Sequence, residues 1–148
     1  MTIDENAPAI SKGEIQINSS PEIIWDIISD IEKWPQWNPD IKWASLDGKL
    51  TAETTFQWKS GPGKITSKIQ TVEPPNQIAW TGKTMGISAV HVWKIEPEDN
   101  ITIVKTEESW NGLIVYIFRK SMQKKLDEAI ESVLQYLKAE AEKKVLQS

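Results

Sequence analysis

Hydrophobic and polar residues alternate with a period of two through the middle of the chain, from about residue 41 to residue 110. This period is typical of half-buried β-strands, whose successive side chains point to opposite faces of a sheet. Turn-forming residues divide the region into successive strands; they are Asp47-Gly48, Ser60-Gly61-Pro62-Gly63, Glu73-Pro74-Pro75-Asn76, 83–86 and Pro97-Glu98-Asp99-Asn100. A further alternating stretch, residues 14–18, precedes them. The pattern predicts a curved antiparallel sheet of about seven strands.

A first helix is indicated before this region by apolar residues three or four positions apart. These residues are Ile24, Ile27, Ile28 and Ile31. They place one apolar face on a helix that ends before Pro35. Ser20 can cap this helix with Pro21 at its first position, or Ser19 and Glu22 can form a capping box.

The C-terminal part, residues 113–148, contains neither glycine nor proline. Its apolar residues recur every three or four positions; they are Met122, Leu126, Ile130, Val133, Leu137 and Ala141. This spacing predicts one long helix that covers the concave face of the sheet. Residues 1–11 are polar without a period, so we expect a tail there and a single domain across 1–148, with its core at about 13–145.

Tryptophan is the outlier of the composition, with eight copies against two Tyr and two Phe. Two of them lie in the connector Trp34-Pro35-Gln36-Trp37-Asn38-Pro39, whose prolines favour a compact turn or a single-turn helix. Alternation places further aromatic residues on inward strand faces; they are Trp43, Phe56, Trp58, Trp80, Trp93 and Trp110. Each indole has about 150–250 Å² of surface that favours burial. The inward tryptophans form either a solid core or the wall of a ligand cavity.

Composition narrows the possible functions. The chain has 148 residues, of which 39% are hydrophobic and 26% charged, as in an ordinary soluble globular domain. A net charge of −4 argues against a nucleic-acid partner. Without cysteine, with one histidine and without clustered carboxylates, the sequence predicts no disulfide, no metal site and no cofactor. It shows no signal peptide and no membrane span, so we expect a cytoplasmic protein, either a monomer or a homodimer.

Two residues are candidates for catalysis. His91 is two positions from Trp93 and can face inward with it, although a solvent-facing histidine is the simpler alternative. Glu108 can face inward between Thr106 and Trp110, although an exposed glutamate at a strand end is again simpler. A carboxylate enclosed by apolar groups can act as an acid or a base. No complete catalytic constellation is visible in the sequence.

The element order β-α-α-β6-α resembles the START/birch-allergen-like (SRPBCC) superfamily, most closely its polyketide cyclase/dehydrase group. Four segments carry the resemblance: the first helix opening at Ser20-Pro21-Glu22, the connector 34–39, the turn 72–80 and the hairpin 93–108. The resemblance covers roughly residues 13–145 and implies an α+β START-like domain. Its helix-grip fold is a seven-stranded antiparallel curved sheet around a long C-terminal helix, with an apolar cavity between them. The Ser60–Gly63 turn lies where hormone-receptor relatives carry a gating loop, with different residues.

The resemblance also implies a function, because relatives bind lipids, sterols, plant hormones or quinones, and some cyclise polyketides. We expect a carrier or sensor that binds a small apolar molecule of lipid, polyketide, sterol or quinone type. A polyketide cyclase/dehydrase-type enzyme is one alternative, and a protein-interaction module resembling heat-shock ATPase activator homologues is another. The expected ligand-binding residues are Trp34, Trp37, Phe56, Trp58, Ser67, Ile69, Trp80, His91, Trp93, Thr106, Glu108 and Trp110.

Overall fold

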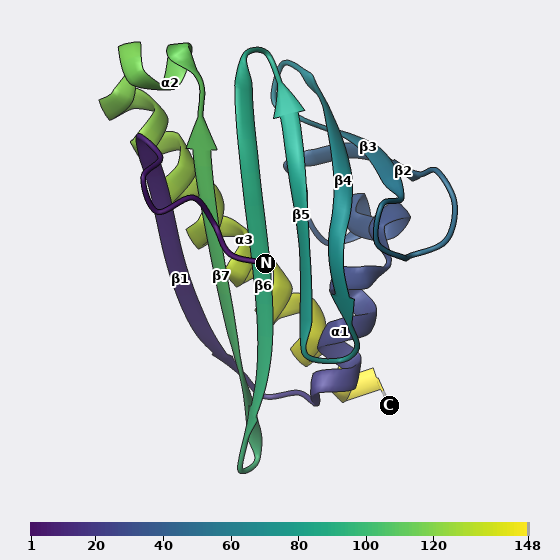
Figure 1. Ribbon diagram of the computed structural model, residues 1–148. Helices are drawn as coiled ribbons and strands as arrows, with labels where there is room; N and C mark the ends of the chain where they lie inside the picture. Colours follow the sequence, from purple (N-terminus) through teal and green to yellow (C-terminus); the bar gives the residue numbers. More distant parts are fainter. Residues whose placement is uncertain (148) are drawn as a thin grey trace.

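The computed structural model describes residues 1–147. One antiparallel sheet of seven strands, in the order β1-β7-β6-β5-β4-β3-β2, curves around the C-terminal helix α3 (Figure 1). The predicted α+β arrangement is therefore confirmed. The elements in chain order are β1 (Ala9–Ile17), α1 (Pro21–Ser29), the 3-10 helix η1 (Ile31–Gln36), β2 (Ile41–Leu46), β3 (Thr55–Ser60), β4 (Lys64–Glu73), β5 (Gln77–Thr84), β6 (Ile87–Glu98), β7 (Ile101–Asn111), α2 (Leu113–Ile117) and α3 (Arg119–Gln147).

Helix α1 is capped by Ser20, which is one of the two predicted arrangements. The Ser20 side chain accepts a hydrogen bond from the backbone N–H of Ile23 at 3.3 Å, and Pro21 occupies the first helical position. This cap satisfies an N–H group that has no partner inside the helix. The alternative capping box is wrong, because the Ser19 hydroxyl is buried without a hydrogen-bond partner in the described part of the chain.

The first eleven residues do not form the predicted tail. Strand β1 already begins at Ala9, which pairs with Trp110 of β7. Ile3 is buried against Ala79 and Val92 on the face of the sheet opposite α3. The sequence predicted this strand only from residue 14 onward, because Gly13 interrupts the apolar alternation. Glycine is needed there, since a Cβ atom would lie 2.9 Å from Cδ1 of Leu134 in α3.

Strand β2 departs from the predicted alternation at Trp43. The register against β3 shifts by one residue between Ile41 and Trp43, as in a β-bulge. The bulge turns Trp43 away from the core, and its side chain is exposed. Ala44 and Leu46 pack against the core instead. A single inserted residue reverses every later side chain of a strand, and alternation alone cannot reveal it.

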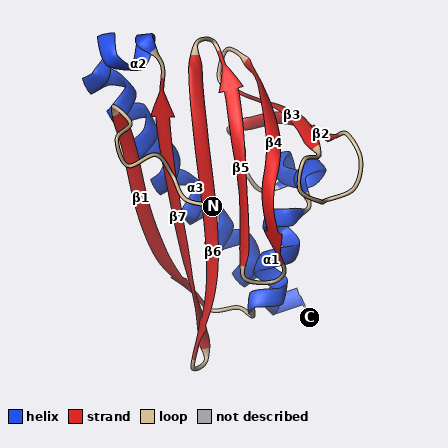
Figure 2. Cartoon of the chain, viewed as in Figure 1, coloured by secondary structure: helices blue, strands red, loops and turns tan. Residues whose placement is uncertain are grey.

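The predicted C-terminal helix is divided into two helices. Phe118, with φ −108° and ψ 43°, separates the short α2 from the 29-residue α3. Residues 113–118 are apolar on all sides, so their spacing could not show that the helix axis changes. Only Val115 of α2 is buried, and α2 lies beside the start of α3 at one end of the molecule (Figure 2). In α3, Leu134 takes the buried position that spacing had assigned to Val133.

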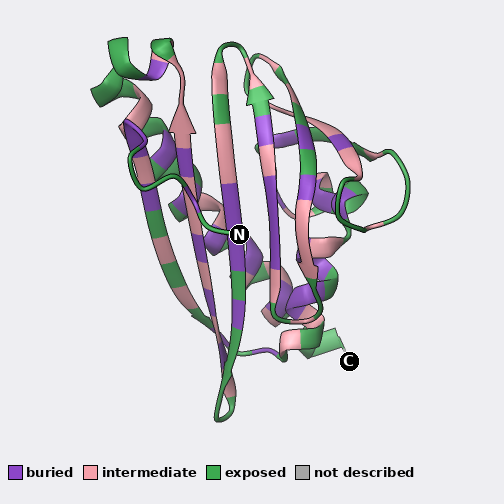
Figure 3. Cartoon of the chain, in the orientation of Figure 1, coloured by how far each residue is buried: buried purple, intermediate pink, exposed green. Residues whose placement is uncertain are grey.

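The apolar core lies between the sheet and the helices α1 and α3. Helix α3 runs diagonally across one face of the sheet and packs mainly against β1 (Figure 1). Its buried residues are Leu126, Ile130, Leu134, Leu137 and Ala141. Figure 3 shows buried segments along the central strands and exposed ones at the sheet ends. A membrane-spanning helix is absent from residues 1–147, since none of their helices combines enough length with enough hydropathy.

Candidate functional site

A cavity of about 450 Å³ lies between the sheet and the first half of α3. A second chamber of about 100 Å³ adjoins it, lined in part by Trp34, Trp93 and Ile130. We call the larger space the outer chamber and the smaller one the inner chamber. They share six lining residues: Trp58, Ser60, Trp80, His91, Glu108 and Ala129. The inward tryptophans therefore form a cavity wall in this half of the sheet, and the solid-core alternative is wrong there.

Small side chains keep the outer chamber open. Gly82 and Ala89 form a cross-strand pair on β5 and β6, and both line the chamber beside Trp80. Ala129 of α3 faces them and lines both chambers. A second stripe of α3 therefore borders the cavity, while the buried stripe packs on β1. Met122, Lys125, Ala129 and Val133 make up this second stripe.

The connector η1 places Trp34 at the centre of the aromatic wall. The centroid of its ring lies 5.6 Å from that of Phe56, 5.4 Å from that of Trp58 and 5.3 Å from that of Trp80. Its indole N–H donates to the carbonyl oxygen of Ile28 at 2.9 Å. The edge-to-face geometry of the first two contacts is the favoured one for aromatic rings. Trp34 is therefore a fixed part of the wall, and the prolines around it position it.

One polar cluster interrupts the apolar lining, and His91 is at its centre. Nε2 of His91 lies 2.7 Å from Oγ1 of Thr106, and Nδ1 lies 3.4 Å from Oε1 of Glu108. The indole N–H of Trp110 donates to Oε2 of Glu108 at 2.8 Å. The side chains of His91 and Glu108 are only 10% and 16% exposed. Both simpler alternatives, a solvent-facing histidine and an exposed glutamate, are therefore wrong.

The cluster has a hydrogen-bond arrangement for each protonation state of His91. When the ring is neutral, Thr106 can donate to Nε2, and the Nδ1 hydrogen faces the carboxylate of Glu108. When the ring is protonated, Nε2 donates to Thr106, whose hydroxyl can then donate to the carbonyl oxygen of Val92 at 3.2 Å. Burial lowers the pKa of His91, and the charge of Glu108 opposes part of this change. The arrangement can hold or release a proton inside the cavity.

Nine of the predicted ligand-binding residues line the cavity: Trp34, Trp37, Trp58, Ser67, Trp80, His91, Trp93, Glu108 and Trp110. The other three, Phe56, Ile69 and Thr106, do not line it. Phe56 and Ile69 are fully buried in the core, behind the wall. Thr106 lies beneath His91 and holds its ring. Alternation gives the face of a strand on which a residue lies, but not how deeply later packing encloses it.

Several lining residues were not predicted. The Ser60–Gly63 turn lines the outer chamber, together with Ile87, Ile114, Met122, Lys125 and Ala129. For the Ser60–Gly63 turn, the sequence offered one indication: the turn lies where hormone-receptor relatives carry a gating loop. Lys125 and Ala129 carried no signal, and Met122 was assigned to the apolar core face, because the two stripes of α3 differ by a single position. Residues 1–147 contain no group of three side chains that could hold a metal ion.

Two indole N–H groups beside the inner chamber have no hydrogen-bond partner among the described residues. They belong to Trp37 and Trp93, and protein atoms cover both nitrogens. An unpaired buried donor costs about 1–3 kcal/mol of stability. Three other wall indoles donate their N–H groups within the protein: Trp34 to Ile28, Trp58 to Ser67 and Trp110 to Glu108.

Comparison with known proteins identifies relatives of this chain. The family model for polyketide cyclase/dehydrase and lipid transport matches residues 9–142. A hypothetical protein from Helicobacter pylori has 16% identity and a TM-score of 0.83, with 93% of this chain and 90% of that chain covered. The Zhui aromatase/cyclase from a Streptomyces species has 11% identity and a TM-score of 0.80, with 92% and 94% covered. A START superfamily protein from Mycobacterium smegmatis has 18% identity and a TM-score of 0.75, with 90% and 97% covered.

These structural likenesses show the fold alone, because all three identities are low. Among curated proteins, none matches the sequence significantly. The fold hosts several functions, so the choice among them depends on the chemistry of the cavity.

Proposed function

This chain belongs to the polyketide cyclase/dehydrase and lipid transport family, and we propose that it binds a small apolar molecule in the cavity between its sheet and α3. The observation that carries the proposal is the outer chamber of about 450 Å³ with its tryptophan wall. Its volume lies within the range of about 300–1,000 Å³ common for small-molecule sites. The ligand is of lipid, polyketide, sterol or quinone type, and the protein acts as its carrier or sensor.

The hydrogen bonds of the wall favour an apolar ligand. Trp58 and Trp110 donate their N–H groups to Ser67 and Glu108, so these two indoles offer a ligand mainly apolar ring surface. Polar side chains on the lining are few, and the His91–Glu108 cluster lines both chambers. A ligand with one polar end would place that end beside the cluster and its apolar body in the outer chamber.

Filling the cavity at Ala129 tests the proposal. Ala129 lines both chambers and is not enclosed in the core, so Ala129→Phe occupies ligand space without overpacking. Ala139→Phe is the matched control, because it adds the same side chain to an exposed position of α3 away from the cavity. The uncharged probe N-phenylnaphthylamine should bind the wild type and Ala139→Phe in the micromolar range. Ala129→Phe should bind it at least about ten-fold more weakly, a loss of about 1.4 kcal/mol.

The thermal midpoint gives a second measurement of the same binding. A ligand that binds only the folded protein raises stability by RT ln(1 + [L]/Kd), about 2.7 kcal/mol at 100 Kd. The probe should therefore raise the midpoint of the wild type and of Ala139→Phe, but not that of Ala129→Phe. Equal probe binding by all three proteins would place the binding site elsewhere and end this proposal.

A cyclase/dehydrase-type enzyme is the second candidate, favoured by the His91–Glu108 cluster inside the cavity. A proton acceptor and a proton donor held side by side can act on one substrate in turn. Glu108→Gln keeps an acceptor for Trp110 but removes the carboxylate. If the protein turns over a polyketide substrate, Glu108→Gln should lower kcat and leave ligand binding in place. Full turnover by Glu108→Gln would exclude this carboxylate from catalysis.

A further inference from the structure

Large apolar side chains gather on the surface at the α2 end of the molecule. Five of them form what we call the mouth patch: Met85, Leu113, Tyr116, Ile117 and Phe118, each between 55% and 76% exposed. Four come from α2 and the residue after it, and Met85 comes from the turn between β5 and β6. Exposed apolar groups that lie together mark a site of interaction, whereas single ones are ordinary.

The mouth patch lies next to the outer chamber, and Met85 belongs to both. Three segments meet there: α2, the β5–β6 turn and the Ser60–Gly63 turn. A Cβ atom on Gly63 would lie 2.7 Å from Sδ of Met85, and one on Gly86 would lie 3.8 Å from Cγ2 of Ile114. Gly63, Met85 and Ile114 also line the outer chamber. The patch therefore adjoins the cavity lining through Met85 and through Ile114 of α2.

Positive charge follows the patch along the chain. Residues 113–125 contain no acidic residue, and their basic residues are Arg119, Lys120, Lys124 and Lys125. Lys125 itself lines the outer chamber. The next acids on α3 are Asp127 and Glu128, and Asp4 lies beside Asn111 at the end of β7. Lys124 pairs with Glu128 at 4.0 Å, so Arg119, Lys120 and Lys125 carry the local excess of cations, in contrast with the net charge of −4 of the whole chain.

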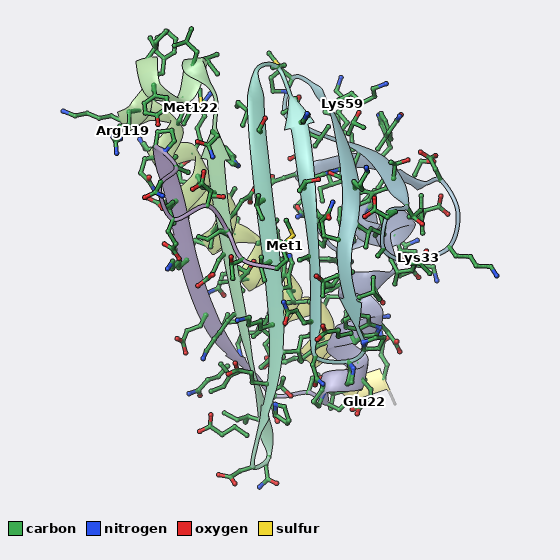
Figure 4. The ribbon with its side chains drawn as sticks, in the orientation of Figure 1. Met1, Glu22, Lys33, Lys59, Arg119 and Met122 are labelled. Carbon is green, nitrogen blue, oxygen red and sulfur yellow. The ribbon has the colours of Figure 1, made fainter. Side chains whose placement is uncertain are left out.

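The shape of the patch fits a flat, deformable partner. Helix α2 projects at the end of the molecule (Figure 1), and Figure 4 shows Arg119 and Met122 at this same end. Only Val115 of α2 is buried, so apolar side chains point outward on several sides. A projecting apolar group next to cations suits the boundary between lipid headgroups and acyl chains, where aromatic rings also prefer to lie. Lysine and arginine beside it attract anionic headgroups.

We propose that the mouth patch docks the protein onto an anionic membrane surface, with α2 inserted among the headgroups and the cavity opening toward the bilayer. An apolar ligand then passes between the bilayer and the outer chamber without crossing water. The passage of ligand rests on the proposed function, whereas the docking does not.

Vesicle binding tests the docking. The full chain is mixed with phosphatidylcholine vesicles, with and without phosphatidylglycerol, and the bound fraction is measured by flotation. We expect binding to the anionic vesicles that weakens as salt is added. The double variant Ile117→Glu, Phe118→Glu should bind at least about ten-fold more weakly. Leu146→Glu is the matched control, because Leu146 is an exposed apolar residue near the other end of α3, and it should bind like the wild type.

A second variant removes charge without touching the apolar residues. Lys120→Gln with Lys124→Gln should reduce the preference for anionic over neutral vesicles by about ten-fold. No vesicle binding by the wild type would overturn the proposal, and so would equal binding by all variants. A dimer that Ile117→Glu, Phe118→Glu dissociates, in a protein that ignores vesicles, would also overturn it and assign the patch to protein association.

Probe binding without vesicles separates the two proposals. All these variants lie on the surface, so each should bind N-phenylnaphthylamine in solution as the wild type does. Loss of vesicle binding with intact probe binding supports membrane docking by the patch. Absence of probe binding in the wild type counts against the proposed function and leaves the vesicle result standing.

Discussion

The two halves of the concave sheet face are both largely apolar but are filled differently. Over β1, helix α3 lies close to the sheet, and Leu126 and Leu137 are fully buried. Over β5 and β6, the same helix leaves a chamber of about 450 Å³. Hydrophobicity alone therefore does not decide whether an inward residue belongs to a core or to a cavity. The distance between helix and sheet decides it.

Small residues set that distance in opposite ways in the two halves. In β1, Gly13 removes the side chain that would meet Leu134, so the helix approaches the strand. At the cavity, the small residues Gly82, Ala89 and Ala129 face one another across the space and leave it open. Large indoles around them prevent collapse, because the wall is braced by ring contacts and by the hydrogen bond from Trp34 to Ile28.

The largest expected difference between the halves concerns truncation of α3 side chains. Leu137→Ala should lower the free energy of unfolding by about 2–5 kcal/mol, because Leu137 is fully buried and a hole would remain. Met122→Ala should lower it by about 1 kcal/mol or less, since Met122 borders existing space. Urea denaturation measures both. Equal losses would show that the cavity half is as tightly packed as the β1 half.

Enlarging a strand residue should show the same contrast with a smaller effect. Gly13→Val should cost about 1–3 kcal/mol, because its Cβ would meet Leu134 at 2.9 Å and Ile130 at 3.0 Å. Ala89→Val adds methyl groups to a position that lines the outer chamber and should cost less than about 1 kcal/mol. The midpoints of urea denaturation of both variants give the comparison. A larger loss for Ala89→Val would contradict it.

The smallest expected effect is a pH dependence from His91 in the cavity half. Above its ordinary pKa of 6.5, the ring is neutral in the folded and the unfolded protein, so it adds no pH dependence. Below 6.5 the unfolded chain binds a proton that the buried ring resists, because burial lowers the pKa of His91. The free energy of unfolding should therefore decrease as the pH falls from about 7 to about 5.

His91→Gln supplies the control for this effect and should flatten the pH profile of the unfolding midpoint in that window. A second group, Glu142, contributes a pH dependence at lower pH. Lys138 and the backbone N–H of Asn18 hold the pKa of Glu142 below its usual 4.5, and the stability this gives is lost only as the pH falls below that value. An identical slope in wild type and His91→Gln between about pH 7 and 5 would assign the dependence to other groups.

The sequence predicted most of the fold from local patterns. A period of two fixes six of the strands, and the isoleucine spacing with the Ser20 cap fixes α1. The features that were not predicted leave no periodic pattern within a single segment of the chain. The bulge before Trp43 needs the partner strand, and the break at Phe118 depends on where the sheet leaves room for a helix.

Apart from Trp43 in the bulged strand β2, the sequence by itself determined which aromatic strand residues point inward, because the strand period is a property of a continuous stretch of chain. It thereby predicted that the tryptophans of the wall can face inward, together with His91 and Glu108. Only the tertiary structure decided what they do there. His91 and Glu108 meet because β6 and β7 pair in one register, and Phe56 and Ile69 lie in the core because other segments cover them. The burial of a side chain and its distance from another side chain depend on how separate segments pack, and no single segment carries that information.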